Sequence, residues 1–237
     1  DKKDSIPYVF LTKEILLQQV EEQDTLHLHC DSIWIYFDTN MRAEEMYAYN
    51  HVKFYRIDMQ GVADTLFYDI KDSLVYFLGR PILWNENNQF TADTISLKVV
   101  ENSVREMFMY PNVIIAQNSD TTTKQYFNQI SGRKFKANLS KNRIKYAEIE
   151  HQVKSIFYFW EEDKKTKKLT GVNIGESSKL NLYFERGRLK KMTAIDLPKF
   201  YLDDNDRIDE KEKILKGFVW LEENRPMSKQ DIFIHRN

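Results

Sequence analysis

The stretch Ala92-Asp93-Thr94-Ile95-Ser96-Leu97-Lys98-Val99 alternates apolar and polar side chains after its opening Ala-Asp pair. Successive side chains of an extended strand point to opposite faces, so Ile95, Leu97 and Val99 share one face and the polar residues between them share the other. A strand with one apolar and one polar face is typical of an antiparallel sheet that covers a core on one side.

The same pattern recurs upstream, which makes it an internal repeat. The earlier copies are Cys30-Asp31-Ser32-Ile33-Trp34-Ile35 and Ala63-Asp64-Thr65-Leu66-Phe67-Tyr68, and successive aspartates are 33 and 29 positions apart. Two degenerate copies, beginning at Gly132 and Ser177, lack the aspartate. A period of about 30 residues predicts stacked units, each made of a few strands.

Length and charge narrow the class of protein. The chain has 237 residues, 42% of them hydrophobic, and a formal net charge of −1. That charge argues against nucleic acid as a partner, which usually demands a strong basic excess. No apolar run approaches the roughly 18 residues that a membrane-spanning helix needs. Cys30 is the only cysteine, which excludes an intrachain disulfide and leaves the compartment open.

The pattern predicts an all-β domain of antiparallel strands over residues 1–195, because amphipathic helices are not evident between residues 25 and 195. Turns are expected at Asn and Asp clusters such as 38–40, 69–72, 85–88, 101–103 and 141–142. Residues 10–22 fit a helix or a strand, and the repeat register favours the strand. Residues 196–237 form an irregular or partly helical extension, whose apolar segment 215–220 is expected to dock on the sheet.

Three features, in order, resemble the OstA-like family, the LptA-type group of lipopolysaccharide export proteins, and most of all a divergent, larger OstA-like group. They are HCDS at 29–32, FNQISGR at 127–133, and LKGFVW at 215–220 followed by Arg225-Pro226. The resemblance implies an open β-jellyroll folded like a taco shell, with lipid A acyl chains in an apolar groove. It also implies a periplasmic location with any signal peptide removed, and edge-strand pairing with other jellyroll proteins of the export bridge or with further copies. The missing aspartates and the extra C-terminal residues depart from the family pattern.

Alternation and the implied groove together give candidates for ligand contact. The expected groove and core lining is Ile33, Ile35, Leu66, Tyr68, Ile95, Leu97, Leu180 and Leu182. Four cations from a basic stretch could form a rim that meets lipid A phosphates or acidic sugars. They are Lys134, Lys136, Arg143 and Lys145. A solvated outer face is the alternative for these cations.

The repeat aspartates Asp31, Asp64 and Asp93 are interpreted as structural, each bonding backbone where the chain bends into a strand. His27 and His29 share a strand face, but zinc requires three or four converging ligands, so no metal or other cofactor is expected. Sequence signatures of phosphate loops, nucleophile elbows and zinc hydrolases are missing. The sequence therefore predicts a non-enzymatic scaffold.

Two other functions remain open. One is a protein–protein adaptor whose interior is filled by its own side chains and takes no lipid. The other is a carbohydrate-active β-solenoid enzyme, which the repeat spacing disfavours because solenoid coils are shorter. The C-terminal segment 218–220 could also cover an open sheet edge and keep the protein monomeric.

Overall fold

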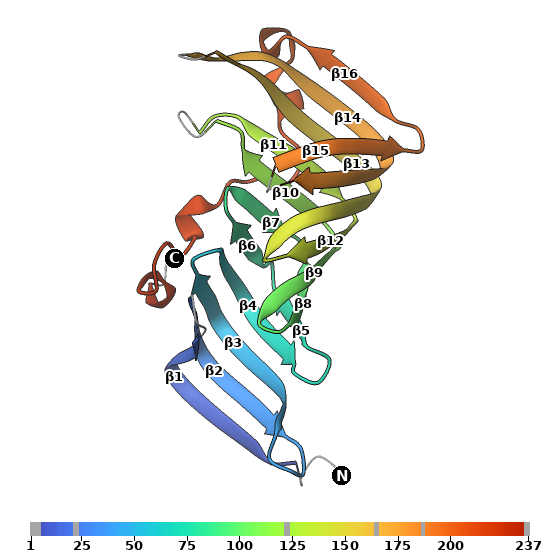
Figure 1. Ribbon diagram of the computed structural model, residues 1–237. Coiled ribbons are helices and arrows are strands. Elements are labelled where there is room, and N and C mark those ends of the chain that lie inside the picture. The colour runs from blue at the N-terminus through green and yellow to red at the C-terminus, as the bar shows by residue number, and fades with distance from the viewer. Residues whose placement is uncertain (1–5, 21–23, 121–123, 164–165, 186–187, 235–237) are drawn as a thin grey trace.

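The computed structural model describes residues 6–20, 24–120, 124–163, 166–185 and 188–234. Within them, sixteen antiparallel strands form one sheet (Figure 1). The strands are β1 (Tyr8–Val20), β2 (Thr25–Phe37), β3 (Ala43–Arg56), β4 (Met59–Asp69), β5 (Leu74–Leu78), β6 (Ile82–Asn85), β7 (Asn88–Thr91), β8 (Thr94–Val100), β9 (Ser103–Tyr110), β10 (Val113–Asn118), β11 (Phe127–Gly132), β12 (Lys134–Ser140), β13 (Arg143–Asp163), β14 (Thr166–Glu185), β15 (Arg188–Ile195) and β16 (Lys199–Asp203). Four short 3₁₀ turns follow: Asn205–Arg207, Glu210–Lys213, Glu222–Asn224 and Asp231–Phe233.

Long strands bend and pair with different neighbours on either side of the bend. In β4, residues 65–69 pair with β5, whereas residues 60–62 pair with β6. In β13, residues 143–150 pair with β12 and residues 154–156 pair with β11. The sheet is thereby folded into two walls along one line of bends.

Wall 1 contains the segments 8–12, 32–37, 43–49, 65–69, 143–150 and 179–185, together with β5, β8, β9, β12 and β15. Wall 2 contains the segments 15–20, 25–30, 52–56, 59–63, 153–163 and 166–176, together with β6, β7, β10, β11 and β16. Bulges or reversed backbone angles mark the bends. Lys13, Asn50, Arg80, Asn112 and His151 all have positive φ there.

The main core lies between the two walls. Phe54 of wall 2 packs against Phe77 of wall 1 with ring centres 5.3 Å apart, and Phe90 of wall 2 faces Phe135 of wall 1. Apolar residues at every second position supply this core, as in β8, where Ile95 and Leu97 are buried. Burial of apolar area at about 25 cal/mol per Å² makes this the main source of stability.

Residues 204–234, here called the strap, run back along the outer face of wall 2 from the C-terminal to the N-terminal strands (Figure 1). Ile208 and Leu215 join Ile156 and Val172 in a second, smaller core beneath it. Phe218 and Trp220 pack on Phe127 of β11. That strand lies inside the sheet rather than at its edge. The contact of 218–220 is therefore with the face of the sheet.

The structure confirms the all-β jellyroll class. It also confirms the strand at 10–22 as far as Val20, and residues 21 and 22 lie outside the described residues. Residues 199–203, beyond the expected domain limit at 195, form β16 and pair with β14. Among the described helical turns, none is long and apolar enough to cross a bilayer.

Candidate ligand groove

The side of the jellyroll opposite the bends is formed by two facing rows of turns. Wall 1 ends in turns at 38–42, 70–73, 101–102 and 141–142. Wall 2 ends in turns that include 57–58 and 86–87. Asp38 and Asp69 stabilise their own turns by accepting hydrogen bonds from backbone N–H groups. The two rows form the mouth through which a ligand would reach the interior.

An apolar cleft of about 380 Å³ opens at the mouth in the N-terminal half. Its lining includes Leu28, Met46 and Ile70 together with four of the predicted groove residues: Ile35, Leu66, Tyr68 and Leu97. Concave, mostly apolar sites of this size are typical of binding sites for small apolar groups. We call this the N-terminal cleft.

A second, smaller cleft of about 80 Å³ lies in the C-terminal half. Phe90, Ile130, Ile144 and Phe157 line it, together with the predicted residue Leu182. We call this the C-terminal cleft.

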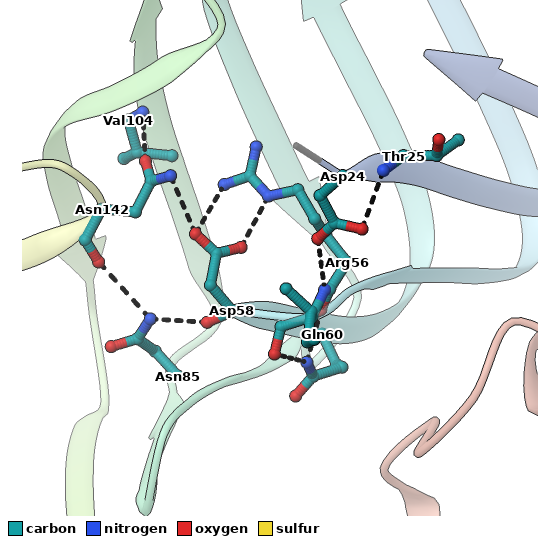
Figure 2. A network of polar contacts seen from close by, with 9 residues as sticks. Asp24, Thr25, Arg56, Asp58, Gln60, Asn85, Val104 and Asn142 are labelled. Carbon is teal, nitrogen blue, oxygen red and sulfur yellow. Dashed lines mark hydrogen bonds and ion pairs between the residues drawn. The ribbon is translucent and has the colours of Figure 1, made fainter. Parts of the chain in front are cut away.

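A network of polar side chains crosses the mouth between the two clefts (Figure 2). From wall 1, the Asn142 side-chain amide donates to the Asp58 carboxylate of wall 2 over 2.8 Å. Asp58 also forms an ion pair with Arg56, with 2.6 Å between Nε and Oδ1. Asn85 donates to the backbone oxygen of Asp58 over 2.7 Å. Asn142 in turn accepts from the N–H of Val104. We call Arg56, Asp58, Asn85 and Asn142 the bridge.

The position of the bridge follows from the residues that it shares with each cleft. Arg56 and Val104 line the N-terminal cleft, whereas Asn85 lines the C-terminal one. A second contact between the walls, the ion pair of Arg143 with Glu86 at 3.2 Å, lies beside the C-terminal cleft. The mouth is therefore divided by polar side chains rather than open along its whole length.

The strap holds the wall 2 side of the bridge. Arg225 donates to the side-chain oxygen of Gln60 and to the backbone oxygen of Glu86. Gln60 itself donates to the backbone oxygen of Arg56. Burial lowers the pKa of the Arg225 guanidinium, but from an ordinary value so high that it stays charged at neutral pH. Arg225 thus joins two neighbouring turns of wall 2.

The eight predicted groove residues divide into two groups. Ile35, Leu66, Tyr68, Leu97 and Leu182 line a cleft. Ile33, Ile95 and Leu180 line neither cleft, and each is at most 1% exposed in the core.

The four predicted rim cations do not come together. Lys136 lies on the outer face of wall 1, with Nζ 3.5 Å from Glu106 and 5.1 Å from the ring centre of Phe108. Lys134 has the same outward parity in β12. Lys145 is an exposed residue at a bulge of β13. Arg143 lies at the mouth, ion-paired with Glu86. The alternation of side chains along a strand indicates which residues share a face. It does not indicate whether that face is the outside of the sheet or borders the mouth.

The repeat aspartates lie at the line of bends. Asp31 is 2.8 Å from the His51 ring nitrogen, and Asp93 accepts from the Asn112 amide over 2.9 Å. The side chain of Asp64 lies against Gly79, which has a φ of +77°. Asp31 and Asp93 thus bond side chains at another bend of the chain, whereas backbone was the expected partner, and the structural role of the three aspartates stays a prediction.

The two predicted strand histidines point to no metal site. His29 is buried, with its Nδ1 at 3.0 Å from the Ile15 carbonyl and its ring against Phe233 of the strap. His27 bonds with Gln18. Three or more possible metal ligands do not converge anywhere in the part of the chain that the structure describes.

Sequence reasoning did not find the bridge. It placed Asn85 and Asn142 in turns; Asn142 lies in one, whereas Asn85 is the last residue of β6. The pattern gave no sign that these two positions face each other. The sequence signal that could have indicated the bridge is the presence of amide or carboxylate side chains, near residues 85 and 142, within a few residues of apolar strand positions.

Comparison with solved structures shows a likeness in fold. Neither a known family model nor a curated protein sequence matches the chain. Among solved structures, the fold aligns with LptH, described as the LptA homologous periplasmic component of the lipopolysaccharide transport device of Pseudomonas aeruginosa. The alignment has a TM-score of 0.44 and 14% identity, and it covers 61% of this chain and 93% of that one.

Proposed function

We propose that this chain is a non-enzymatic scaffold that binds the acyl chains of lipopolysaccharide or a similar lipid in the periplasm. The observation that carries the proposal is the N-terminal cleft, an apolar cleft of about 380 Å³ at the mouth of a folded sheet. Each methylene that leaves water for such a cleft contributes about 0.8 kcal/mol. The three sequence features at 29–32, 127–133 and 215–226 support the choice of lipid class.

For the headgroup of the lipid we propose Arg143 as a contact. Its guanidinium lies beside the C-terminal cleft and is 57% exposed, so a phosphate could compete for it with Glu86. Guanidinium groups bind phosphate through two parallel hydrogen bonds, which favours arginine over lysine in this role.

Partners are proposed to join at the two ends of the sheet. Within the described residues, β1 pairs with β2 alone, and β15 and β16 pair with β14 alone. β1 is antiparallel to β2, and both β15 and β16 are antiparallel to β14. The chain at each end of the sheet therefore runs from the mouth of wall 1, through the bend, into wall 2. Neighbours stacked end to end would therefore pair these edges in parallel, and Tyr8, Phe10 and Phe200 are exposed near them.

The lipid proposal is tested by filling the N-terminal cleft. Val75 lines it, whereas the next residue, Tyr76, packs on Phe67 on the outer face of wall 1. We expect Val75→Trp to weaken binding of a fluorescent fatty acyl probe, and of lipopolysaccharide that competes with it, by at least about tenfold. That factor corresponds to about 1.4 kcal/mol. Tyr76→Trp places the same indole outside and should leave binding unchanged. Equal affinity of both variants, each folded by circular dichroism, would remove the cleft from consideration.

An adaptor that takes no lipid is the second candidate. The full burial of Ile33, Ile95 and Leu180 favours it, because the interior is tightly packed at these positions. Absence of binding of both the acyl probe and lipopolysaccharide to the unmodified chain would support the adaptor.

A further inference from the structure

We propose that the bridge is a latch, which keeps the two clefts separate when closed and joins them into one groove when its contacts across the mouth break. This inference rests on the proposed lipid function and concerns how that site is regulated. It starts from the location of the four side chains. They connect turns of opposite walls, at the boundary between the N-terminal and C-terminal clefts.

The core between the walls is apolar in the part of the chain that the structure describes, so the polar contacts at the mouth require a separate explanation. Arg56 and Asn85 are only 8% and 7% exposed. Burying polar groups costs free energy unless every partner is present, and apolar side chains would close this position without that cost. Polar contacts differ from apolar ones in that water can replace each partner when the walls separate.

Among the described residues, few of the bridge bonds cross from one wall to the other and would have to break for the latch to open. The contacts that cross from wall 1 to wall 2 are Asn142 to Asp58 at 2.8 Å and Asn85 to the Asn142 backbone oxygen at 3.4 Å. Arg143 to Glu86 at 3.2 Å is the ion pair beside them. The other bridge bonds described above, from Arg56 and Asn85 to Asp58 and from Val104 to Asn142, lie within one wall. Arg56 to Asp58 and Val104 to Asn142 therefore keep each half of the latch in shape while the mouth opens.

The strap sets the position of the wall 2 half. Arg225 bonds Gln60, which bonds the Arg56 backbone oxygen, and Arg225 also bonds the Glu86 backbone oxygen. The arginine of the Arg-Pro pair at 225–226 therefore has a structural role. It fixes two turns of wall 2 at the spacing that Asn142 of wall 1 requires.

The consequence for ligand binding depends on chain length. A short acyl chain fits within the N-terminal cleft and does not need the latch to open. A long chain must extend past Arg56 and Asn85 to reach the C-terminal cleft. Locking the latch should therefore slow uptake of a long-chain probe and leave a short-chain probe unaffected.

The test locks the latch reversibly. Asp58→Cys and Asn142→Cys are introduced together and joined by a short bis-methanethiosulfonate crosslinker, which dithiothreitol removes. Uptake rates of fluorescent probes with 8-carbon and 16-carbon chains are measured before and after the crosslinker is removed. Three neighbouring strands span roughly 14 Å. At about 1.3 Å per carbon, the 8-carbon chain is shorter than this span and the 16-carbon chain is longer. We expect the 16-carbon probe to enter at least about tenfold more slowly when locked, and the 8-carbon probe to enter at an unchanged rate.

The matched control joins two residues of one wall. Phe108 and Lys136 are register partners on the outer face of wall 1, so Phe108→Cys with Lys136→Cys takes the same crosslinker without spanning the mouth. This control should change neither rate. Unchanged long-chain uptake in the locked chain would overturn the latch and leave lipid binding intact. Absence of uptake in every state, including the unmodified chain, would overturn lipid binding and the latch together.

A second variant tests the strap without a crosslinker. Arg225→Ala should increase hydrogen exchange at the Val104 amide. Without Arg225 the turn that carries Asp58 shifts, so the Asn142 side chain, which accepts the hydrogen bond from the Val104 N–H, is held less firmly. Gln89→Ala loosens the strap at another point and should leave Val104 protected. Equal exchange in the two variants would separate the strap from the latch.

Discussion

Leu221 donates its backbone N–H to the side-chain oxygen of Gln89 over 2.8 Å, although the two residues are 132 positions apart in the chain. The same side chain donates to the Val219 carbonyl, so one buried glutamine pairs with the strap as a strand backbone would. Gln129 repeats this arrangement with Leu215 and Lys213. Wall 2 thus binds the strap through side chains that imitate a neighbouring strand.

Gln89→Ala should destabilise the fold by about 2 kcal/mol, because it leaves a backbone N–H and a carbonyl without partners under the strap. Urea unfolding followed by fluorescence measures the change. Gln19→Ala, at an exposed position of β1, is the control and should change stability by less than about 0.5 kcal/mol. A loss at Gln89 no larger than at Gln19 would mean that the strap contributes little to stability.

Gly79→Ala should be costly for two reasons that can be separated. The φ of +77° disfavours any side chain, and an added Cβ would lie 2.4 Å from the Asp64 carboxylate. We expect a loss of more than about 1 kcal/mol in thermal or urea unfolding. Combining it with Asp64→Ala should recover only the part of the loss that comes from the carboxyl group, because the Cβ of residue 64 would still lie 2.6 Å from the added Cβ. Additive losses in the double variant would show that the two residues are not in contact.

Much of the fold could be predicted from local pattern, because alternation in β8 is a property of neighbouring residues. It correctly places Ile95 and Leu97 on the inner face. The difference between them, one in the core and one in a cleft, depends on the distance to the opposite wall and is absent from the strand itself. The Asp58–Asn142 contact joins turns 84 positions apart. Its prediction requires the line of bends, which the sequence indicates only through Asp31, Asp64 and Asp93.

Cys30 should be inert in the folded protein. It is fully buried, and burial, with a smaller effect of Asp31, raises the pKa of its thiol from 9.0 to about 11. Because the raised pKa favours the neutral thiol, its contribution to stability is complete below pH 9 and is lost as the pH rises toward 11. A thiol reagent at pH 8 should react only in denaturant. The stability difference between Cys30 and Cys30→Ala proteins should shrink from pH 9 to 11. Rapid labelling without denaturant would contradict the burial.

Parallel pairing of the sheet ends can be tested by crosslinking between molecules. Thr12 and Ala194 both lie near the bend at opposite ends of the sheet, whereas Leu189 lies near the mouth. Thr12→Cys mixed with Ala194→Cys should give crosslinked dimers with a short bis-maleimide at high protein concentration. Thr12→Cys mixed with Leu189→Cys should not. The reverse outcome would indicate antiparallel pairing, and monomers in both mixtures would indicate that the edges do not associate.

Ile95→Ala and Leu97→Ala should separate core from groove, although the two residues are neighbours on one face of β8. Ile95 is completely buried, so its truncation leaves a closed cavity and should cost about 2–5 kcal/mol. Leu97 borders the N-terminal cleft, so its truncation enlarges an existing space and should cost less. In native conditions, however, Leu97→Ala should weaken acyl probe binding several-fold, while Ile95→Ala should bind normally in its folded fraction. Weaker binding in Ile95→Ala than in Leu97→Ala would reverse the assignment of the two positions.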